Sequence, residues 1–179
     1  MRIVAGRWAG RLLTSPAGRV RPTSEELRDR TMELLAKDLP GARVLDLFAG
    51  TGALGLEALS RGAKYADFVE NHPSALHSLK ANVAALRTRD IARIYKKDAV
   101  PFMEALEAER YDIALVDPPY DSSLADRVVR RWLEVPFARV LLVEHAADAT
   151  LPARGKRYPA GDACLTVLRA PGPATTGRR

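Results

Sequence analysis

Four residues, Asp117-Pro118-Pro119-Tyr120, follow the apolar run "IALV" and combine groups that could handle an amine. The Asp117 carboxylate and the Pro118 carbonyl oxygen can each accept a hydrogen bond from one amine nitrogen. Two such acceptors favour the sp³ geometry of a nucleophilic nitrogen and stabilise the charge that develops on it. The Tyr120 ring could stack on the base that carries the amine. We predict catalytic roles for Asp117, Pro118 and Tyr120; the alternative is a plain strand terminator.

A glycine-rich turn precedes this loop in the chain. The stretch "DLFAGTGALGLEAL" contains Gly50-Thr51-Gly52, with the spacing G-x-G-x-x-G completed by Gly55. Glycines at this spacing let the backbone turn tightly and approach a ligand. Glu70 ends the next predicted strand, where a carboxylate can accept hydrogen bonds from both ribose hydroxyls. The pattern predicts a nucleotide-like ligand; a tight turn without a ligand is the alternative.

The acidic residues around this turn indicate which ligand. Asp46, just before the turn, would repel a pyrophosphate, which disfavours a dinucleotide. S-adenosylmethionine has no phosphate and offers an α-ammonium for Asp46, a carboxylate for the loop N–H groups and a ribose for Glu70. Its adenine amine could bind Asp98, which could equally cap a helix, and Ala99 could add a backbone contact. The predicted cofactor-binding residues are Asp46, Gly50, Thr51, Gly52, Glu70, Asp98 and Ala99.

Alternating strand and helix patterns position these residues. Strand-like segments cover residues 43–50, 65–70, 92–98, 111–117 and 139–145, and helical patterns cover 24–37, 54–61, 74–86, 100–109 and 124–135. Thr23 and Glu26 form a capping box for the first helix. The alternation predicts an α/β fold with a doubly wound, mostly parallel sheet that binds ligands at the carboxyl ends of its strands. Residues 156–170 predict a closing antiparallel hairpin.

Basic charge is concentrated at the N-terminus. The chain has 179 residues and a formal net charge of +6, and its first 22 residues contain five arginines and no acidic residue. We expect a basic β-hairpin arm over residues 1–22, one domain over 23–170 and a flexible tail over 171–179. The charge favours a nucleic-acid partner. The residues predicted to contact phosphates are Arg2, Arg7, Arg11 and Arg21.

Several classes are disfavoured by composition. Apolar residues make up 47% of the chain, but no stretch reaches the ~20 residues of a membrane span, and no signal-peptide pattern is present. We therefore expect a cytoplasmic protein. The single cysteine, Cys164, cannot form an internal disulfide and has no metal-ligand companions, so we expect it in the core and predict no metal site.

Longer motifs add a resemblance to a known family. "DPPY" after "DLFAGTGALGLEALSRGA" resembles the amino-methyltransferases of nucleic acids, and the order "MRIVAGRWAGRLL", "RPTSEELRDRT" and these motifs is similar to the RsmD-type 16S ribosomal RNA guanine-N2 methyltransferases. The resemblance implies methylation of a guanine N2 amine in small-subunit ribosomal RNA. Because the chain has only an arm and short loops for recognition, we expect it to recognise substrate shape, as in an assembling subunit, and to act as a monomer. The resemblance also implies that Thr23 lies near S-adenosylmethionine. The sequence departs from the family at Met32-Glu33 and at His72.

Other functions remain open from the residues alone. Adenine-N6 methyltransferases of DNA share "DPPY", although their recognition of duplex sequence needs extra mass that this chain lacks. A non-catalytic RNA-binding assembly factor would have no use for Asp117 and Tyr120, and Asp46 disfavours an NAD-dependent oxidoreductase. The choice of guanine over adenine rests on the resemblance.

Overall fold

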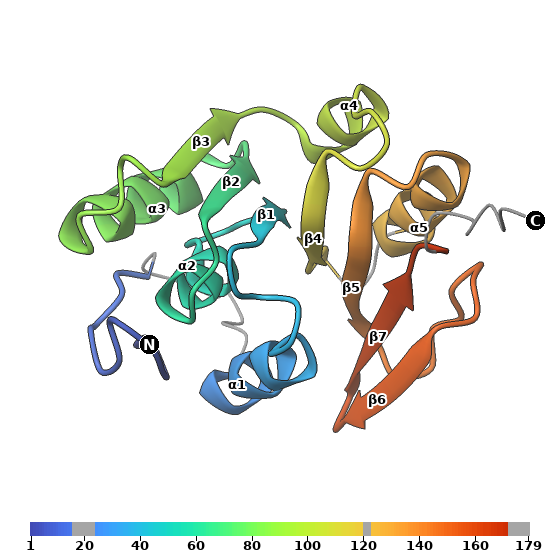
Figure 1. Ribbon diagram of the computed structural model, residues 1–179, viewed down its shortest axis with the longest axis horizontal. Coiled ribbons are helices and arrows are strands. Elements are labelled where there is room, and N and C mark those ends of the chain that lie inside the picture. Colours follow the sequence, from blue (N-terminus) through green and yellow to red (C-terminus); the bar gives the residue numbers. More distant parts are fainter. Residues whose placement is uncertain (16–23, 120–122, 172–179) are drawn as a thin grey trace, which may run out of the picture.

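A seven-stranded sheet forms the centre of the computed structural model, which describes residues 1–15, 24–119 and 123–171. The strand order is β3-β2-β1-β4-β5-β7-β6, with β1 to β5 parallel and β7 and β6 antiparallel at one edge (Figure 1). The strands are β1 (Arg43–Leu47), β2 (Tyr65–Glu70), β3 (Ala92–Lys96), β4 (Tyr111–Val116), β5 (Ala138–Ala146), β6 (Lys156–Ala160) and β7 (Ala163–Arg169). The predicted parallel sheet and closing hairpin are confirmed.

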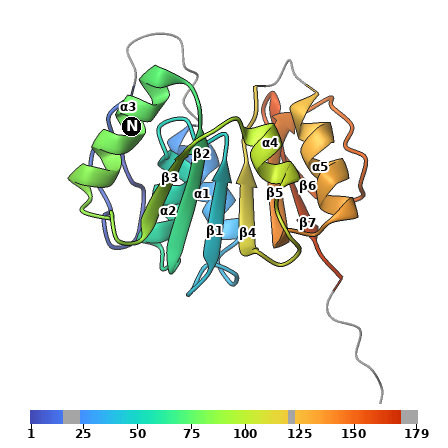
Figure 2. The ribbon, with the colours of Figure 1, turned by 90° about the horizontal axis from the view of Figure 1, so that it is seen from above.

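Helices cover both faces of this sheet. They are α1 (Glu25–Leu34), α2 (Ala53–Ser60), α3 (Pro73–Ala85), α4 (Ala99–Glu104) and α5 (Leu124–Glu134). One apolar core joins the sheet to α1, α2 and α3, and a second joins it to α4 and α5, which lie together on one side (Figure 2). None of the helices in the described ranges has both the length and the apolarity needed to cross a bilayer.

Two helices end before the sequence pattern does. The helix predicted to reach Lys37 ends at Leu34, because the following N–H groups bond to carbonyls three residues back in turns. The helix predicted to reach Glu109 ends at Glu104, since the chain must turn to bring Glu109 to its bond with the Pro136 carbonyl oxygen beside the sheet.

The N-terminal cap of α1 is Ser24 rather than the predicted Thr23. The Ser24 hydroxyl accepts a hydrogen bond from the Leu27 N–H at 3.0 Å, which satisfies one of the free donors of the first turn. Thr23 lies outside the described residues, so its expected place near a cofactor stays a prediction. Cys164 is buried in β7, as predicted.

The N-terminal arm lies against α2 and contributes to the core. A single antiparallel bridge joins Arg2 and Leu12, with the tight turns predicted between them. Ile3 and Leu13 are buried in the same core as α1 and α2, so these parts of the arm pack as core residues. The Arg7 N–H donates to the Ser60 carbonyl oxygen at 2.8 Å. The arm is therefore held in a defined position beside α2.

A buried carboxylate anchors the arm. Glu57 of α2 has no exposed surface and accepts backbone hydrogen bonds from Val4 at 2.8 Å and Ala5 at 2.9 Å. It also forms ion pairs with the buried Arg28 of α1 at 3.4 Å and with Arg61 at 2.9 Å. Four donors from three segments thus converge on one side chain, which ties the arm, α1 and α2 together.

We expect Glu57→Gln to lower the free energy of unfolding by about 3 kcal/mol, because it removes the buried carboxylate charge that is paired with the Arg28 guanidinium. Urea unfolding measures this. Glu25→Gln is the matched control: it removes the ion pair of Glu25 with Arg2, which is exposed, and should cost less than about 1 kcal/mol. Equal effects of the two substitutions would contradict the anchoring role of Glu57.

Candidate functional site

A cavity of about 1500 Å³ opens at the carboxyl ends of the parallel strands. It lies where β1 and β4 are neighbours, the point at which the sheet reverses its direction of winding and where ligands bind in such folds. The volume exceeds the range of ordinary small-molecule sites and is sufficient for two ligands. Of the predicted site residues, its wall includes Asp46, Gly50, Thr51, Glu70, Asp98, Ala99, Asp117 and Pro118.

The glycine-rich turn leaves backbone exposed to this cavity. Gly50 has a φ of 55° and no atom within 4 Å of the place a Cβ would occupy, so the turn presents open space there. Gly52 has a φ of 79°, and a Cβ on it would lie 2.4 Å from Leu79 Cδ1. Gly52 therefore shapes the turn from behind and is absent from the cavity wall. Phe48 also has a positive φ of 70°, an unusual conformation for a bulky residue.

Asp46 lies inside β1, and its carboxylate faces α2. It is 1% exposed, and its Oδ2 accepts the Gly55 N–H at 2.8 Å. Burial, together with the nearby charges of Asp117 and Glu70, raises the pKa of Asp46 to about 8, against the opposing effect of the Gly55 hydrogen bond. A cation bound in the cavity would stabilise the ionised carboxylate.

Glu70 holds the glycine-rich turn from the end of β2. Its Oε2 accepts the Gly50 N–H at 2.8 Å, and its Oε1 accepts the N–H groups of Asn71 at 2.8 Å and His72 at 2.7 Å. A carboxylate can accept about four hydrogen bonds, so capacity remains for a hydroxyl donor. The three backbone bonds fix the orientation of this carboxylate at the cavity wall.

Asp98 has the capping role that the sequence left open. It is the N-cap of α4, and its Oδ1 accepts the Val100 N–H at 2.8 Å. The same side chain lines the cavity, beside Ala99. The cap uses one oxygen, which leaves the other for a ligand, so capping and binding are compatible.

Asp117 and Pro118 follow directly after β4 at the cavity. Asp117 is half-buried and close enough to Asp46 for its charge to affect the pKa of that residue. Pro118 is buried and Pro119 is exposed. Tyr120 lies outside the described residues, as does Arg21. The structure thus gathers carboxylates from the ends of β1, β2 and β4 in one cavity.

Two residues at this site were not predicted from the sequence. Glu144, near the end of β5, is 5% exposed and lines the cavity; an acidic residue in the apolar run "RVLLVEH" was the available signal. Asn82 of α3 donates to the carbonyl oxygens of Thr14 at 3.0 Å and Thr51 at 2.9 Å, and it accepts the Thr14 N–H. Asn82 therefore links the arm to the glycine-rich turn, a contact that no local pattern shows.

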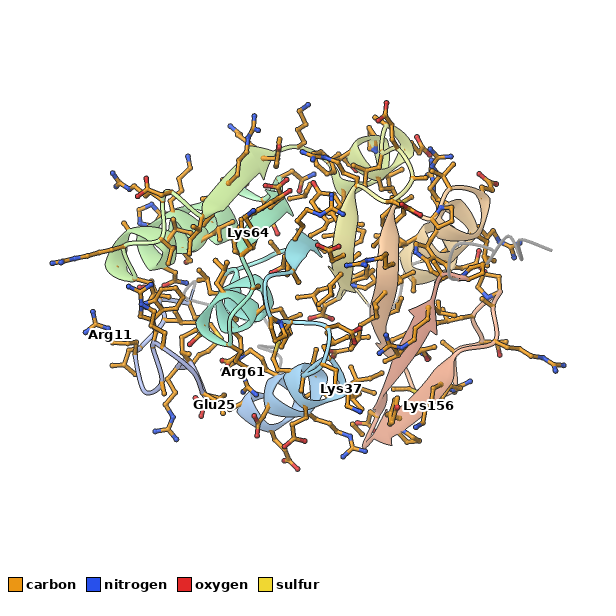
Figure 3. The ribbon with its side chains drawn as sticks, in the orientation of Figure 1. Arg11, Glu25, Lys37, Arg61, Lys64 and Lys156 are labelled. Carbon is orange, nitrogen blue, oxygen red and sulfur yellow. The ribbon has the colours of Figure 1, made fainter. Side chains whose placement is uncertain are left out.

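The arginines of the arm have different surroundings. The Arg2 guanidinium is paired with Glu25 at 3.1 Å. Arg7 lies over the Trp8 ring, 5.4 Å from its centroid. Arg11 extends away from the rest of the molecule (Figure 3). Among the arm cations that the structure describes, Arg7 and Arg11 are thus the best placed to contact a partner.

Comparison with known proteins assigns the chain to a family. Residues 1–158 match the family model described as "Conserved hypothetical protein 95". The chain belongs to this family, the RsmD-type methyltransferases. It is 37% identical over 130 residues to the ribosomal RNA small subunit methyltransferase D of Escherichia coli, an alignment that covers 72% of this chain and 65% of that protein. The predicted methyltransferase family is confirmed.

Solved structures share the fold. A Thermus thermophilus protein is 31% identical and superposes with a TM-score of 0.82, over 95% of this chain and 99% of that one. A T. thermophilus 16S rRNA N2 G1207 methyltransferase, solved with AdoMet and guanosine, is 23% identical with a TM-score of 0.64, over 86% of this chain and 44% of its own. The predicted doubly wound α/β fold is confirmed, and it is the Rossmann-like fold of methyltransferases.

Proposed function

We propose that this methyltransferase transfers a methyl group from S-adenosylmethionine to the exocyclic N2 amine of a guanine in small-subunit ribosomal RNA, the guanine at position 966. One observation carries the proposal: Asp117 and Pro118 lie in the same cavity as Asp46, Glu70 and Asp98. Acceptors suited to an amine and acceptors suited to a nucleoside thus meet in one space. The E. coli relative bears the name of a ribosomal RNA methyltransferase, which supports the choice of RNA.

The residues of the cavity fit S-adenosylmethionine, which supplies an electrophilic methyl group when bound. Glu70 would accept a ribose hydroxyl, and Asp46 would face the α-ammonium. The glycine-rich turn, which leaves open space at Gly50, would receive the carboxylate. Asp98 and Ala99 would contact the adenine. The ammonium, the carboxylate, the ribose and the adenine amine of the molecule then each have a partner on the wall.

The residues after β4 would prepare the amine. The Asp117 carboxylate and the Pro118 carbonyl oxygen each accept a hydrogen bond from one N–H of this amine. These two bonds hold the nitrogen lone pair in a fixed direction. The prolines have no N–H and a fixed φ, so this loop orders at low entropic cost. Tyr120 is proposed to stack on the flipped base.

The raised pKa of Asp46 predicts a pH dependence of cofactor binding. Below pH 8 the free protein holds Asp46 protonated, so binding the α-ammonium requires loss of this proton. Affinity should rise about tenfold per pH unit from pH 6 towards 8 and fall above it, because the α-amino group then loses its own proton. Calorimetric titration measures this. Asp46→Asn should remove the rising limb; an affinity independent of pH between 6 and 8 in the wild type would contradict the assignment.

The basic arm is proposed to bind RNA phosphates. The double variant Arg7→Ala with Arg11→Ala should weaken RNA binding about tenfold. The slope of log K against log[salt] should become less steep by about one to two, and cofactor affinity should stay unchanged. Filter binding at several salt concentrations tests this. Lys37→Ala with Lys64→Ala, two exposed cations on the main body (Figure 3), removes the same net charge and should have a smaller effect. Equal loss from both pairs would indicate a general charge effect.

A panel of nucleic acids tests the proposed function. Labelled S-adenosylmethionine is offered with assembling small ribosomal subunits that lack the modification, with naked ribosomal RNA and with duplex DNA. We expect label in ribosomal RNA, most efficiently in the subunit, by a monomeric enzyme. Label in DNA would instead support the adenine-N6 alternative, and binding without any label would support the assembly-factor alternative.

A further inference from the structure

Glu144 is a buried carboxylate in the cavity to which the proposed reaction gives no role. It lies in β5, is 5% exposed, and lines the same cavity as Asp117 and Pro118. We propose that Glu144 selects guanine by accepting the N1–H of the base whose N2 amine is held by Asp117. This inference rests on the proposed function and names the residue that sets its base specificity.

The register of the sheet brings Glu144 beside Asp117. Strands β4 and β5 are parallel, and the last residue of β4, Val116, pairs with Val143. Continuing this register by one residue places Asp117, which follows β4, opposite Glu144 of β5. Neighbouring strands lie about 4.8 Å apart, a separation that two side chains can close around one edge of a base. The two carboxylates are therefore adjacent at the carboxyl edge of the sheet.

Alternation along the strands places both side chains on the same face. Leu115 and Leu142 pair with each other and are buried in the core that faces α1 and α2. Residues two positions apart share a face of a strand, so Asp117 and Glu144 continue this face beyond the core. Asp46 belongs to the same row, because its register partner in β4 is Leu115.

Small residues leave room beside Glu144. The turn between β6 and β7 contributes Ala160, Gly161 and Ala163 to the cavity wall, and Ala163 pairs with Ala146, two residues after Glu144. No large side chain from this turn fills the space. A planar ring can therefore approach the Glu144 carboxylate from the cavity.

The chemistry of the purine edge then provides selection. Guanine carries an N1–H donor next to its N2 amine, whereas adenine and 2-aminopurine carry an unprotonated N1 with a lone pair. A buried carboxylate accepts the N1–H of guanine and repels the lone pair of the others, with little water to screen the repulsion. Asp117 and the Pro118 carbonyl oxygen accept from any amine, so they alone do not distinguish these bases.

The test compares guanine with 2-aminopurine at the target position. Both carry the N2 amine, so each can be methylated, but only guanine has N1–H. A ribosomal RNA fragment, naked and in a reconstituted small-subunit particle, is given to the wild type and to Glu144→Gln. We expect the wild type to prefer guanine over 2-aminopurine by at least about 10³-fold in kcat/KM. In Glu144→Gln this ratio should be at least about tenfold smaller. The absent O6 of 2-aminopurine affects both proteins alike and cancels.

Two controls separate selection from a structural role. Asp117→Asn should lower the rates for both purines by the same factor and leave the ratio unchanged, since both bases present the amine. Calorimetric binding of S-adenosylmethionine should be the same, within about twofold, for Glu144→Gln and the wild type. Glu144→Asp is a second variant that keeps the charge but shortens the side chain, and it should also reduce the preference.

The outcomes are distinct. An unchanged ratio in both Glu144 variants, or an equal loss for both purines, would overturn the role of Glu144 and leave the proposed function standing. Failure of the wild type to methylate either purine, in RNA or in the particle, would overturn the proposed function and this inference with it.

Discussion

Replacing Asp117 with alanine is expected to lower kcat for guanine methylation by at least about 10³-fold and to change the affinity for S-adenosylmethionine by less than about tenfold. The substitution removes an acceptor that acts mainly when positive charge develops on the amine, so its loss falls on turnover. Single-turnover kinetics with saturating cofactor measure the chemical step, and calorimetry measures binding.

The small change in S-adenosylmethionine affinity caused by Asp117→Ala also has an expected direction. The charge of Asp117 contributes to the raised pKa of Asp46, so removing it lowers that pKa and favours the ionised form at pH 7. Cofactor binding by Asp117→Ala should therefore be equal to or slightly tighter than that of the wild type. Asp117→Asn keeps an oxygen acceptor and should retain more activity than the alanine variant. A loss of cofactor affinity comparable to the loss of turnover would make Asp117 a cofactor ligand.

Replacing Glu70 with alanine should weaken S-adenosylmethionine binding by about 100-fold. The change removes the proposed acceptor of a ribose hydroxyl, a charge-assisted bond of about 1.5 to 3 kcal/mol. It also leaves the N–H groups of Gly50, Asn71 and His72 without their carboxylate acceptor, which loosens the glycine-rich turn.

Glu26→Ala is the matched control for this loss. Glu26 is an exposed carboxylate of α1 on the same cavity wall, and no hydrogen bond joins it to the glycine-rich turn in the described part of the chain. Its removal changes the charge of the cavity by the same amount as Glu70→Ala, but it should alter the affinity for S-adenosylmethionine by less than about threefold. A similar loss in both variants would mean that general electrostatics, and not the ribose contact, determines binding.

The order of strands and helices was predictable because each element carries its own signal. The apolar runs of the parallel strands and the amphipathic pattern of α5 are local, and burial of Val128 and Trp132 follows from their spacing. The convergence of the candidate site residues was predictable for a related reason: they lie at or near the ends of parallel strands, which meet at one edge of the sheet. Asp46, Glu70 and Asp117 therefore meet without any knowledge of the loops.

Contacts between distant segments were not predictable in this way. The bonds of Glu57 to Val4 and Ala5 join residues more than fifty positions apart, and nothing near Glu57 in the sequence marks it as an anchor. Glu144 was missed because an acid within an apolar strand gains meaning only from its neighbour in the sheet. Ser24 replaced Thr23, the predicted cap: both residue types can cap a helix, and serine is the more strongly preferred of the two.

The identity of the methylated nucleoside tests the central claim most directly. The wild-type protein is incubated with labelled S-adenosylmethionine and small ribosomal subunits that lack the modification, and the RNA is digested to nucleosides for mass spectrometry. We expect the label in N2-methylguanosine, at one site, and no label with Asp117→Ala. Label in N6-methyladenosine, or no labelled nucleoside at all, would contradict this expectation.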